Sequence, residues 1–288
     1  MSDARRAVVM LHSVVPDREL DARLVPRPRQ ELGTEELRRF VHDARAAGWS
    51  IVGLSELLDT SGSGGHRLAV TFDDGYRDFA DHALPVLRAL DVPATLFVTT
   101  GYPDRTLLHV SLVVEDLVRS RAALRLRTPD GPRTVECHDP VDAATQVNRI
   151  IWEAGLDTAT EILGDYREEW VDYGLTWEQL HEIARDPLTT IGGHTTSHPF
   201  LPALDPQACA AEIDGNRRRL RTELGVPVEH FAYPFGRHSD TVVQAVRRAG
   251  YAAAVTTEPR DVDARDALHV LPRFCAESGR PFAATVDG

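Results

Sequence analysis

Two adjacent carboxylates, Asp73 and Asp74, follow an apolar run in the stretch Leu68–Tyr76, which reads LAVTFDDGY. Its first half, Leu68–Phe72, is a short, mostly apolar run that predicts a buried strand. Because side chains alternate between the two faces of a strand, Asp73 and Asp74 cannot both point one way while the strand continues. A turn at the strand's end would let both reach one pocket, where two ionised carboxylates need a cation or several hydrogen-bond donors between them. The stretch therefore predicts a cation close by.

Two histidines four residues apart are the candidate partners for that cation. His194 and His198 lie in the segment GGHTTSHP, residues 192–199. The flanking glycines and proline disfavour a helix, so we expect a loop that follows a strand. Two imidazoles and one carboxylate form an open set of three ligands that leaves a position for water or substrate. Histidines of this spacing also occur as hydrogen-bonding loop residues, and the neighbouring Asp-Asp strand end is what favours a metal site.

Short predicted strands alternate with predicted helices along the chain, which at this spacing implies parallel pairing through right-handed crossovers. We expect an α/β fold with a closed or partly closed parallel barrel. The alternative is an open doubly wound sheet, but no Gly-rich phosphate loop follows an early strand. The predicted strands are Ala7–Leu11, Trp49–Val52, Leu68–Phe72, Ala94–Val98, Leu188–Ile191, His230–Tyr233, Ala252–Val255 and Leu268–Leu271, and the predicted helices run from Thr34 to Gly48, Arg77 to Leu90, Thr176 to Ala184, Asp205 to Gly225 and Ser239 to Gly250.

Residues 103–175 interrupt this alternation. Leu107–Leu117 and Val141–Leu163 predict helices, and Arg125–Asp139 predicts an irregular hairpin between them. We expect a mostly helical insertion that covers or shapes the pocket, within a single domain that spans residues 1–288.

The net charge, the length of the apolar runs and the cysteines bear on the kind of partner and on the cellular compartment. The net charge of −12 argues against a nucleic-acid partner. No run approaches the length of a transmembrane helix, and the five apolar residues Ala7–Leu11 are too few for the core of a signal peptide, which favours a cytoplasmic protein. Three distant cysteines without a C-x-x-C pair indicate neither a disulfide framework nor a cysteine zinc site. The sequence carries no signal for an oligomeric state.

Several of these segments together resemble the polysaccharide deacetylases, the NodB-like carbohydrate esterases. Thr71–Gly75 (TFDDG) and His194–His198 (HTTSH) are similar to the first two motifs of that family, and Phe231–Gly236 (FAYPFG) to the third. Met10–His12 and Leu271–Arg273 (LPR) are similar to the opening strand-histidine and the C-terminal signature of one branch.

The resemblance implies a distorted (β/α)7 barrel with its site at the C-terminal ends of the strands. It also implies hydrolysis of an N-acetyl group from an amino sugar or glycoconjugate, with metal-bound water as the nucleophile. Asp74, His194 and His198 would bind Zn²⁺, or Co²⁺, Ni²⁺ or Mn²⁺, and Asp73 would be the general base. The residues expected around the substrate are Tyr76, Tyr233, Pro234, Phe235 and Gly236, with the N–H of Phe235 facing the developing oxyanion.

Two positions depart from the family pattern. The third motif usually carries an arginine that orients the catalytic base, but Ala232 occupies that place, and we expect Arg273 to replace it. The usual general-acid histidine lies near the C-terminus, where His269 fits only superficially. We favour His12, because a barrel can place its first strand where other members place their last.

Two other functions remain open at this point. Related members of the superfamily resemble hydrolases of cyclic amides or imides, which would keep the metal chemistry and change the substrate. A non-catalytic carbohydrate-binding protein would keep only the fold. Binding alone needs no base beside a metal, so the presence of Asp73, Asp74, His194 and His198 disfavours this alternative. For the leading hypothesis we expect an N-acetylated cytoplasmic sugar, such as a glycolipid precursor, a nucleotide sugar or a natural-product glycoside.

Overall fold

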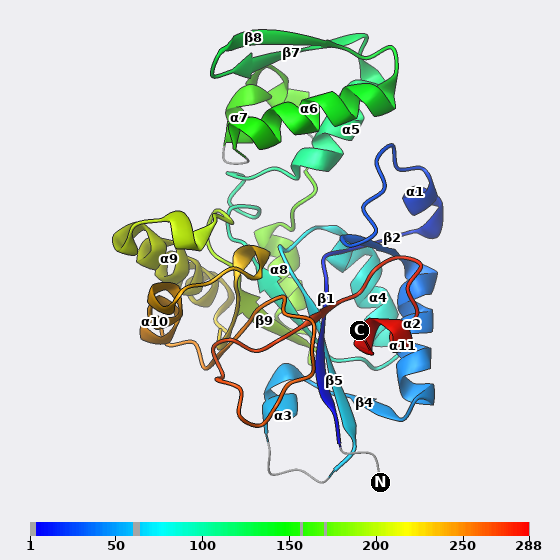
Figure 1. Cartoon of the computed structure of the whole chain (residues 1–288), viewed down its shortest axis with the longest axis vertical. Helices are drawn as coiled ribbons and strands as arrows, with labels where there is room; N and C mark the ends of the chain where they lie inside the picture. The colour runs from blue at the N-terminus through cyan, green and yellow to red at the C-terminus, as the bar shows by residue number, and fades with distance from the viewer. Residues whose placement is uncertain (1–3, 60–63, 156–157, 170–171, 288) are drawn as a thin grey trace.

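A parallel sheet forms the centre of the structure, a computed structural model that describes residues 4–59, 64–155, 158–169 and 172–287 (Figure 1). Its strands are β1 (Arg6–Leu11), β4 (Trp49–Ile51), β5 (His66–Phe72), β6 (Ala94–Val98), β9 (Thr189–Gly193), β10 (His230–Ala232), β11 (Ala253–Val255) and β12 (Phe274–Cys275). The strand order is β11-β10-β9-β6-β5-β1-β12, and β4 also pairs with β5. Every pairing within this sheet is parallel.

One short segment joins the two edges of the sheet. Leu271 forms a single parallel bridge to Val255 of β11, and Phe274 pairs with Val9 of β1. The sheet therefore curls into a distorted barrel of seven consecutive strands, which confirms the expected (β/α)7 architecture. The predicted strand Leu268–Leu271 is wrong, however. The chain turns over residues 268–269, and Pro272, which has no N–H to donate, stands before the strand that does form.

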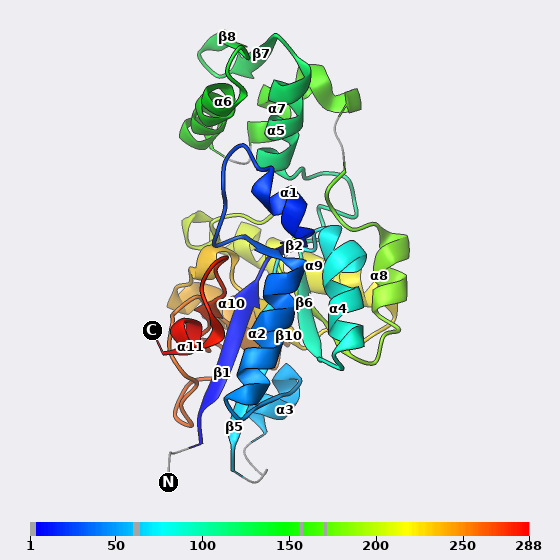
Figure 2. The same ribbon diagram turned by 90° about the vertical axis from the view of Figure 1, so that its right-hand side faces the viewer.

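Apolar side chains alternate between the two faces of the strands. Val9 and Val70 belong to the core between the sheet and the outer helices, whereas Val8 and Ala69 belong to a smaller cluster that includes Phe97 inside the barrel. This is the period of two that strands impose. The covering helices, several of which Figure 2 shows from the side, are α2 (Thr34–Ala46), α3 (Leu54–Leu58), α4 (Leu84–Ala89), α8 (Trp177–Ile183), α9 (Pro206–Leu224), α10 (Asp240–Arg248) and α11 (Phe282–Val286).

The sequence predicts helix ends well where a cap is present. Asp205 accepts hydrogen bonds from the N–H groups of Gln207 and Ala208 at the start of α9, and Gly225 closes that helix at φ 68°. Thr176 caps α8 as expected. Thr34 is the first residue of α2 rather than its cap, because Gly33 takes the N-cap position.

The helix predicted over Arg77–Leu90 starts later than expected. A π-helical turn, Phe79–Ala83, comes first and leads into α4. Among the helices of the described ranges, none is both long and apolar enough to cross a membrane. Most of the connection predicted at Ser61–Gly65 lies outside the described residues.

The insertion has a hydrophobic core of its own. It contains α5 (Val110–Ser120), α6 (Pro140–Ala154), α7 (Ala159–Ile162) and a regular antiparallel hairpin of β7 (Ala123–Thr128) and β8 (Gly131–Glu136). In Figures 1 and 2 it lies beyond the end of the sheet where β1 leads into β2 (Ser13–Val15). That one domain spans residues 1–288 with this insertion stays a prediction.

The N-terminal segment and the end of the insertion both reach the same edge of the barrel. After β2, the chain forms α1 (Asp17–Asp21) and β3 (Glu31–Gly33), which pairs with β2. Tyr76 forms an antiparallel bridge with Gly174. The insertion is thus joined to the barrel beside the Asp73–Asp74 pair.

Candidate active site

A sharp backbone turn at the end of β5 separates the two adjacent carboxylates. The N–H of Asp73 still donates to the carbonyl of Leu11, 2.9 Å away, so this residue continues the pairing of β5 with β1. Asp74 adopts φ 73° and Gly75 φ 88°, in the left-handed region that side chains other than glycine rarely enter. This turn replaces strand alternation with a bend and gives each carboxylate its own partners.

Asp73 is held by Arg273. Both carboxylate oxygens of Asp73 accept hydrogen bonds of 2.7 Å from the two terminal nitrogens of the guanidinium. Arg273 also donates from Nε to the carbonyl of Thr256 (2.8 Å) and from Nη1 to the hydroxyl of Thr71 (3.1 Å), and its side chain is 0% exposed. Burial raises the pKa of Asp73, but the charge and hydrogen bonds of Arg273 outweigh it and the pKa falls below its ordinary value. Asp73 is therefore ionised.

Asp74 faces the two histidines instead. Its Oδ1 atom lies 3.4 Å from Nε2 of His194 and 3.4 Å from Nε2 of His198. One ligand atom from each of the three residues lies within 4.8 Å of the others. Nδ1 of His194 lies 2.7 Å from the carbonyl of Ala232, which can only accept, so Nδ1 carries the proton of the neutral ring and Nε2 is the nitrogen that can bind a metal. Carboxylate oxygen and imidazole nitrogen are zinc ligands, and the donor set fits Zn²⁺ or a similar divalent ion.

The two histidines of this cluster differ in their protonation. Burial lowers the pKa of His198 to about 4, so the imidazole is neutral near neutral pH. Burial raises the pKa of Asp74, but the hydrogen bond with His194 and the charges of nearby histidines bring it well below its ordinary value. Burial also lowers the pKa of His194, yet the hydrogen bond and charge of the carboxylates bring it above its ordinary value. A divalent ion would displace that proton, because only a neutral imidazole is a ligand.

The loop between the histidines is not helical, as predicted. Thr195 and His198 have φ values of 66° and 57°, and the hydroxyl of Thr195 accepts a hydrogen bond from the N–H of His198. Positive φ at residues with side chains stores strain that the surroundings must hold in place.

The structure brings His12, and not His269, to the two carboxylates. His12 directly follows β1 and interacts electrostatically with both Asp73 and Asp74, and its buried Nδ1 atom has no hydrogen-bond partner among the described residues. Nε2 of His269 lies 2.9 Å from the carbonyl of Tyr251, which precedes β11. His269 is therefore at the opposite end of its neighbouring strand from the Asp-His-His cluster.

The third motif forms a short 3₁₀ turn, Pro234–Gly236, at the end of β10. Phe235 adopts φ 57°, is 44% exposed and packs its ring 4.7 Å from the ring of His198. Pro234 and Gly236 are buried. Tyr233 is 0% exposed and its hydroxyl donates to the carbonyl of His269, so in this conformation it offers no surface to a sugar. Of the four, Phe235 is the residue that reaches solvent beside the cluster.

Tyr76 connects Asp74 to Tyr102, which precedes the insertion, and to His109 within it. Its ring lies 5.3 Å from that of Tyr102 and 4.3 Å from that of His109, and the two tyrosine hydroxyls are 3.5 Å apart. Burial and the negative charge of Asp74 raise the pKa of Tyr76 well above its ordinary value. The hydroxyl therefore stays protonated and able to donate beside Asp74.

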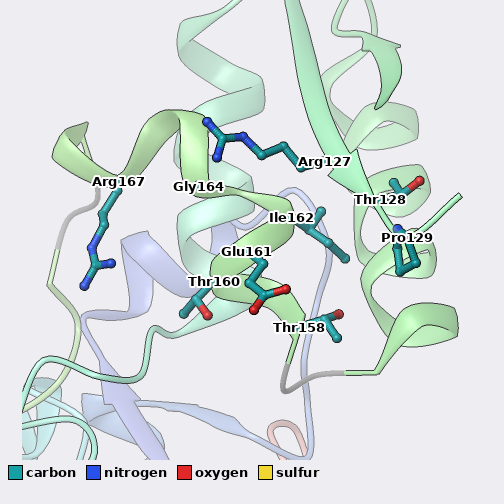
Figure 3. Close-up of a pocket in the computed structure, with 9 residues that line it drawn as sticks. All are labelled: Arg127, Thr128, Pro129, Thr158, Thr160, Glu161, Ile162, Gly164 and Arg167. Atoms are coloured by element: carbon teal, nitrogen blue, oxygen red, sulfur yellow. The ribbon is translucent and has the colours of Figure 1, made fainter. Parts of the chain in front are cut away.

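A separate surface pocket lies on the insertion (Figure 3). It contains none of the residues that the sequence predicts for the site. Its lining comes from Arg127, Thr128, Pro129, Thr158, Thr160, Glu161, Ile162, Gly164 and Arg167.

Two further residues, Glu212 and Asn216, bind the loop between the two histidines with their side chains, and no motif in the sequence predicts them. Both lie on α9, four residues apart and so on one face of the helix. The only signal in the sequence is an asparagine at a position where the helix turns toward the barrel, which by itself does not identify a site.

Solved structures with the same fold support the barrel architecture. A Streptococcus pyogenes deacetylase, PplD, in complex with acetate aligns with a TM-score of 0.66 and 18% identity over 98% of this chain and 97% of its own. A de-N-acetylase from Aggregatibacter actinomycetemcomitans aligns with a TM-score of 0.66 and 14% identity over 97% of this chain and 98% of its own. IcaB from Ammonifex degensii aligns at 0.60 with 20% identity over 94% and 91%. At these identities the likeness concerns the fold.

Sequence comparison identifies the family. The chain is 28% identical over 116 residues to YxkH of Bacillus subtilis (strain 168), which is named as a polysaccharide deacetylase. That match covers 39% of this chain and 41% of YxkH, less than half the length of either. The family model described as "Polysaccharide deacetylase" matches residues 61–254, which include Asp73, Asp74, both histidines and the third motif. With its barrel and its motif residues in place, the chain belongs to the polysaccharide deacetylase family.

Proposed function

We propose that this chain is a metal-dependent hydrolase that removes an N-acetyl group from an amino sugar or glycoconjugate. The observation that carries the proposal is that the two adjacent carboxylates, Asp73 and Asp74, have different partners. Asp74 clusters with His194 and His198. The carboxylate of Asp73 instead accepts two hydrogen bonds from the buried guanidinium of Arg273. Two carboxylates in different electrostatic environments are the usual basis for separate roles in acid–base chemistry.

Asp74, His194 and His198 would hold the metal. The ion is proposed to be Zn²⁺, and Co²⁺, Ni²⁺ or Mn²⁺ would accept the same donors. A divalent ion bound there supplies a Lewis acid that polarises the acetyl carbonyl and lowers the pKa of water toward about 7.

Asp73 would act as the general base. Arg273 occupies one lone pair on each carboxylate oxygen, and each oxygen keeps a second lone pair that can accept a proton. The ion pair keeps Asp73 ionised and fixes its plane, so Arg273 is a positioning residue. It takes over the role that an arginine at position 232 has in the family pattern.

His12 would act as the general acid that protonates the leaving amine. It directly follows β1, and its buried Nδ1 atom has no hydrogen-bond partner in the part of the chain that the structure describes. An imidazole is suited to this transfer near neutral pH.

The exposed ring of Phe235 and the hydroxyl of Tyr76 are proposed to contact the sugar. The N–H of Phe235 is proposed to donate to the oxyanion that develops on the acetyl group, a contribution of roughly 3 kcal/mol when well aimed.

The proposal is tested by acetate release from the protein loaded with Zn²⁺ or Co²⁺. The substrate panel contains N-acetylglucosamine oligomers, a nucleotide-linked N-acetylglucosamine and a cyclic imide. We expect acetate from at least one N-acetylated sugar, loss of release after chelation, and recovery when metal is added back. Opening of the imide without acetate release would support the cyclic amide alternative, and sugar binding without any turnover would support a carbohydrate-binding protein.

A further inference from the structure

Side chains on one face of α9 form hydrogen bonds with the loop that carries His194 and His198. The contacts come from Glu212 and Asn216, which lie one helical turn apart. Neither residue is a candidate metal ligand, and neither belongs to a family motif quoted above.

Glu212 binds the middle of the loop with both carboxylate oxygens. Oε2 accepts hydrogen bonds of 2.9 Å from the backbone N–H groups of Thr196 and Ser197. Oε1 accepts a 2.7 Å hydrogen bond from the hydroxyl of Ser197. A carboxylate that accepts from two consecutive N–H groups fixes the orientation of both peptides, and such charge-assisted bonds are stronger than neutral ones.

Asn216 binds the start of the loop from a fully buried position. Its Nδ2 donates to the carbonyls of Thr195 (2.5 Å) and Val98 (2.9 Å), and its Oδ1 accepts from the N–H of His194 (3.2 Å). One side chain thus joins α9, the end of β6 and the first residue of the loop.

A glycine at the end of β9 allows the helix to approach this closely. A Cβ on Gly193 would lie 2.6 Å from Oδ1 of Asn216 and closer still to the hydroxyl of Tyr251. The position of Asn216 against β9 therefore depends on the lack of a side chain at Gly193.

We infer that Glu212 and Asn216 are positioning residues for the metal site, which preorganise the loop so that both imidazoles face Asp74. The inference rests on the proposed function in assuming that the cluster binds a divalent ion. Its physical basis is the backbone of the loop: Thr195 and His198 both sit at positive φ, a conformation that needs outside support. Without Glu212, the N–H groups of Thr196 and Ser197 would turn to water and the loop could relax.

The decisive variant is Glu212→Ala, compared with Glu223→Ala as the matched control. Glu223 lies on the same helix but pairs with Arg219 instead of the loop. We expect Glu212→Ala to bind Zn²⁺ at least about tenfold more weakly than wild type in a competition titration with a chelator. Its Co²⁺ complex should also show a changed absorption spectrum, whereas Glu223→Ala should match wild type in both measurements.

Glu212→Gln separates positioning from a general loss of stability. A glutamine can accept both N–H bonds with its carbonyl and donate to Ser197 Oγ with its amide, so it should restore the affinity and the Co²⁺ spectrum. If Glu212→Ala does not fold, Glu212→Asp replaces it, because aspartate keeps the charge but withdraws it from the loop by one methylene. Its Zn²⁺ affinity should lie below that of wild type.

The outcomes of the titration are distinguishable. Wild-type affinity and an unchanged Co²⁺ spectrum in Glu212→Ala, or in Glu212→Asp if that variant is used, would overturn the inference and leave the proposed metal site intact. A wild-type protein that binds neither Zn²⁺ nor Co²⁺ would overturn the metal site itself and the inference with it.

Discussion

At the scale of single residues, removal of either partner from the buried ion pair of Arg273 and Asp73 would destabilise the folded protein. The guanidinium is fully enclosed and donates hydrogen bonds to Asp73, Thr71 and the carbonyl of Thr256. Burial alone raises the pKa of Asp73, and the arginine is what reverses that shift. Removal of the arginine would leave a carboxylate that is both buried and unpaired.

Arg273→Ala should therefore destabilise the protein by about 3–5 kcal/mol at neutral pH. The double variant Arg273→Ala with Asp73→Asn should lose less than the sum of the two single changes, because it leaves no unpaired charge. Urea unfolding of the four proteins measures this coupling. Additive losses would show that the pair does not act as a unit.

His12→Ala should lower kcat by about 10²–10⁴-fold while bound Zn²⁺ stays at the wild-type level, because a general acid is not a ligand. His269→Ala is the control, since its ring contacts a backbone carbonyl at the other end of the barrel. Acetate release and metal analysis of both variants check the assignment. Unchanged turnover in His12→Ala would transfer the acid role to another group.

The proposed metal ligands lie in local motifs, which is why the sequence could point to them, and their roles stay predictions. The Asp-Asp turn and the His-x-x-x-His loop are each contained in a few residues, and the structure brings all three proposed ligands together. Arg273 was inferred from the alanine at position 232, and it does contact Asp73. Tyr233 shows the limit of this reasoning, because the alternation of β10 turns its side chain into the core beneath the helices.

At the scale of elements, the approach of α9 to β9 depends on the lack of a side chain at Gly193. Gly193→Ala should cost at least about 1–3 kcal/mol, because the new methyl group would overlap Asn216 and Tyr251. Gly53→Ala is a suitable control, since a Cβ there meets no atom within 4 Å. Thermal unfolding of the two variants tests this difference, and equal melting temperatures would contradict the close packing.

The contact between β2 and the π-helical turn makes stability depend on pH. Asp78 accepts hydrogen bonds from the hydroxyl of Ser13 and the N–H of Val14, yet burial raises its pKa from 3.8 to about 7. Between these values the folded chain holds a proton that the unfolded chain has released, so this contribution to stability falls as pH rises through the window.

Asp78→Asn removes that titration and keeps a carbonyl acceptor for the same contacts. Relative to wild type, the variant should be more stable at pH 8 than at pH 5. Urea midpoints of both proteins at the two pH values measure the change. A difference that is constant with pH would show that Asp78 titrates normally.

Element boundaries were predicted less well than the elements themselves. The central strands fall within one or two residues of their predicted positions, because continuous apolar runs between turns define them. The last strand was misplaced since Leu268–Leu271 is apolar enough to suggest a strand, while the pairing with β1 that decides the matter begins at Phe274. Such a choice between two short segments depends on tertiary contacts.

At the scale of the whole molecule, the site is assembled from distant parts of the chain. Arg273 and Asp73 are 200 residues apart, and His12 comes from the first strand. The closing segment Leu271–Cys275 bridges β11 and β1, so the position of Arg273 depends on closure of the barrel. Tyr102, just before the insertion, and His109 within it surround Tyr76, a grouping that no local pattern in the sequence predicts.

The central claim is that Asp73 and Asp74, although adjacent, have different roles, Asp73 as the general base and Asp74 as a metal ligand. The most direct measurement is bound Zn²⁺ together with acetate release in Asp73→Asn and Asp74→Asn, made side by side. Asp73→Asn should keep the wild-type metal content and lose about 10²–10⁴-fold in kcat, whereas Asp74→Asn should lose the metal. Loss of metal in Asp73→Asn, or full activity in either variant, would contradict the account.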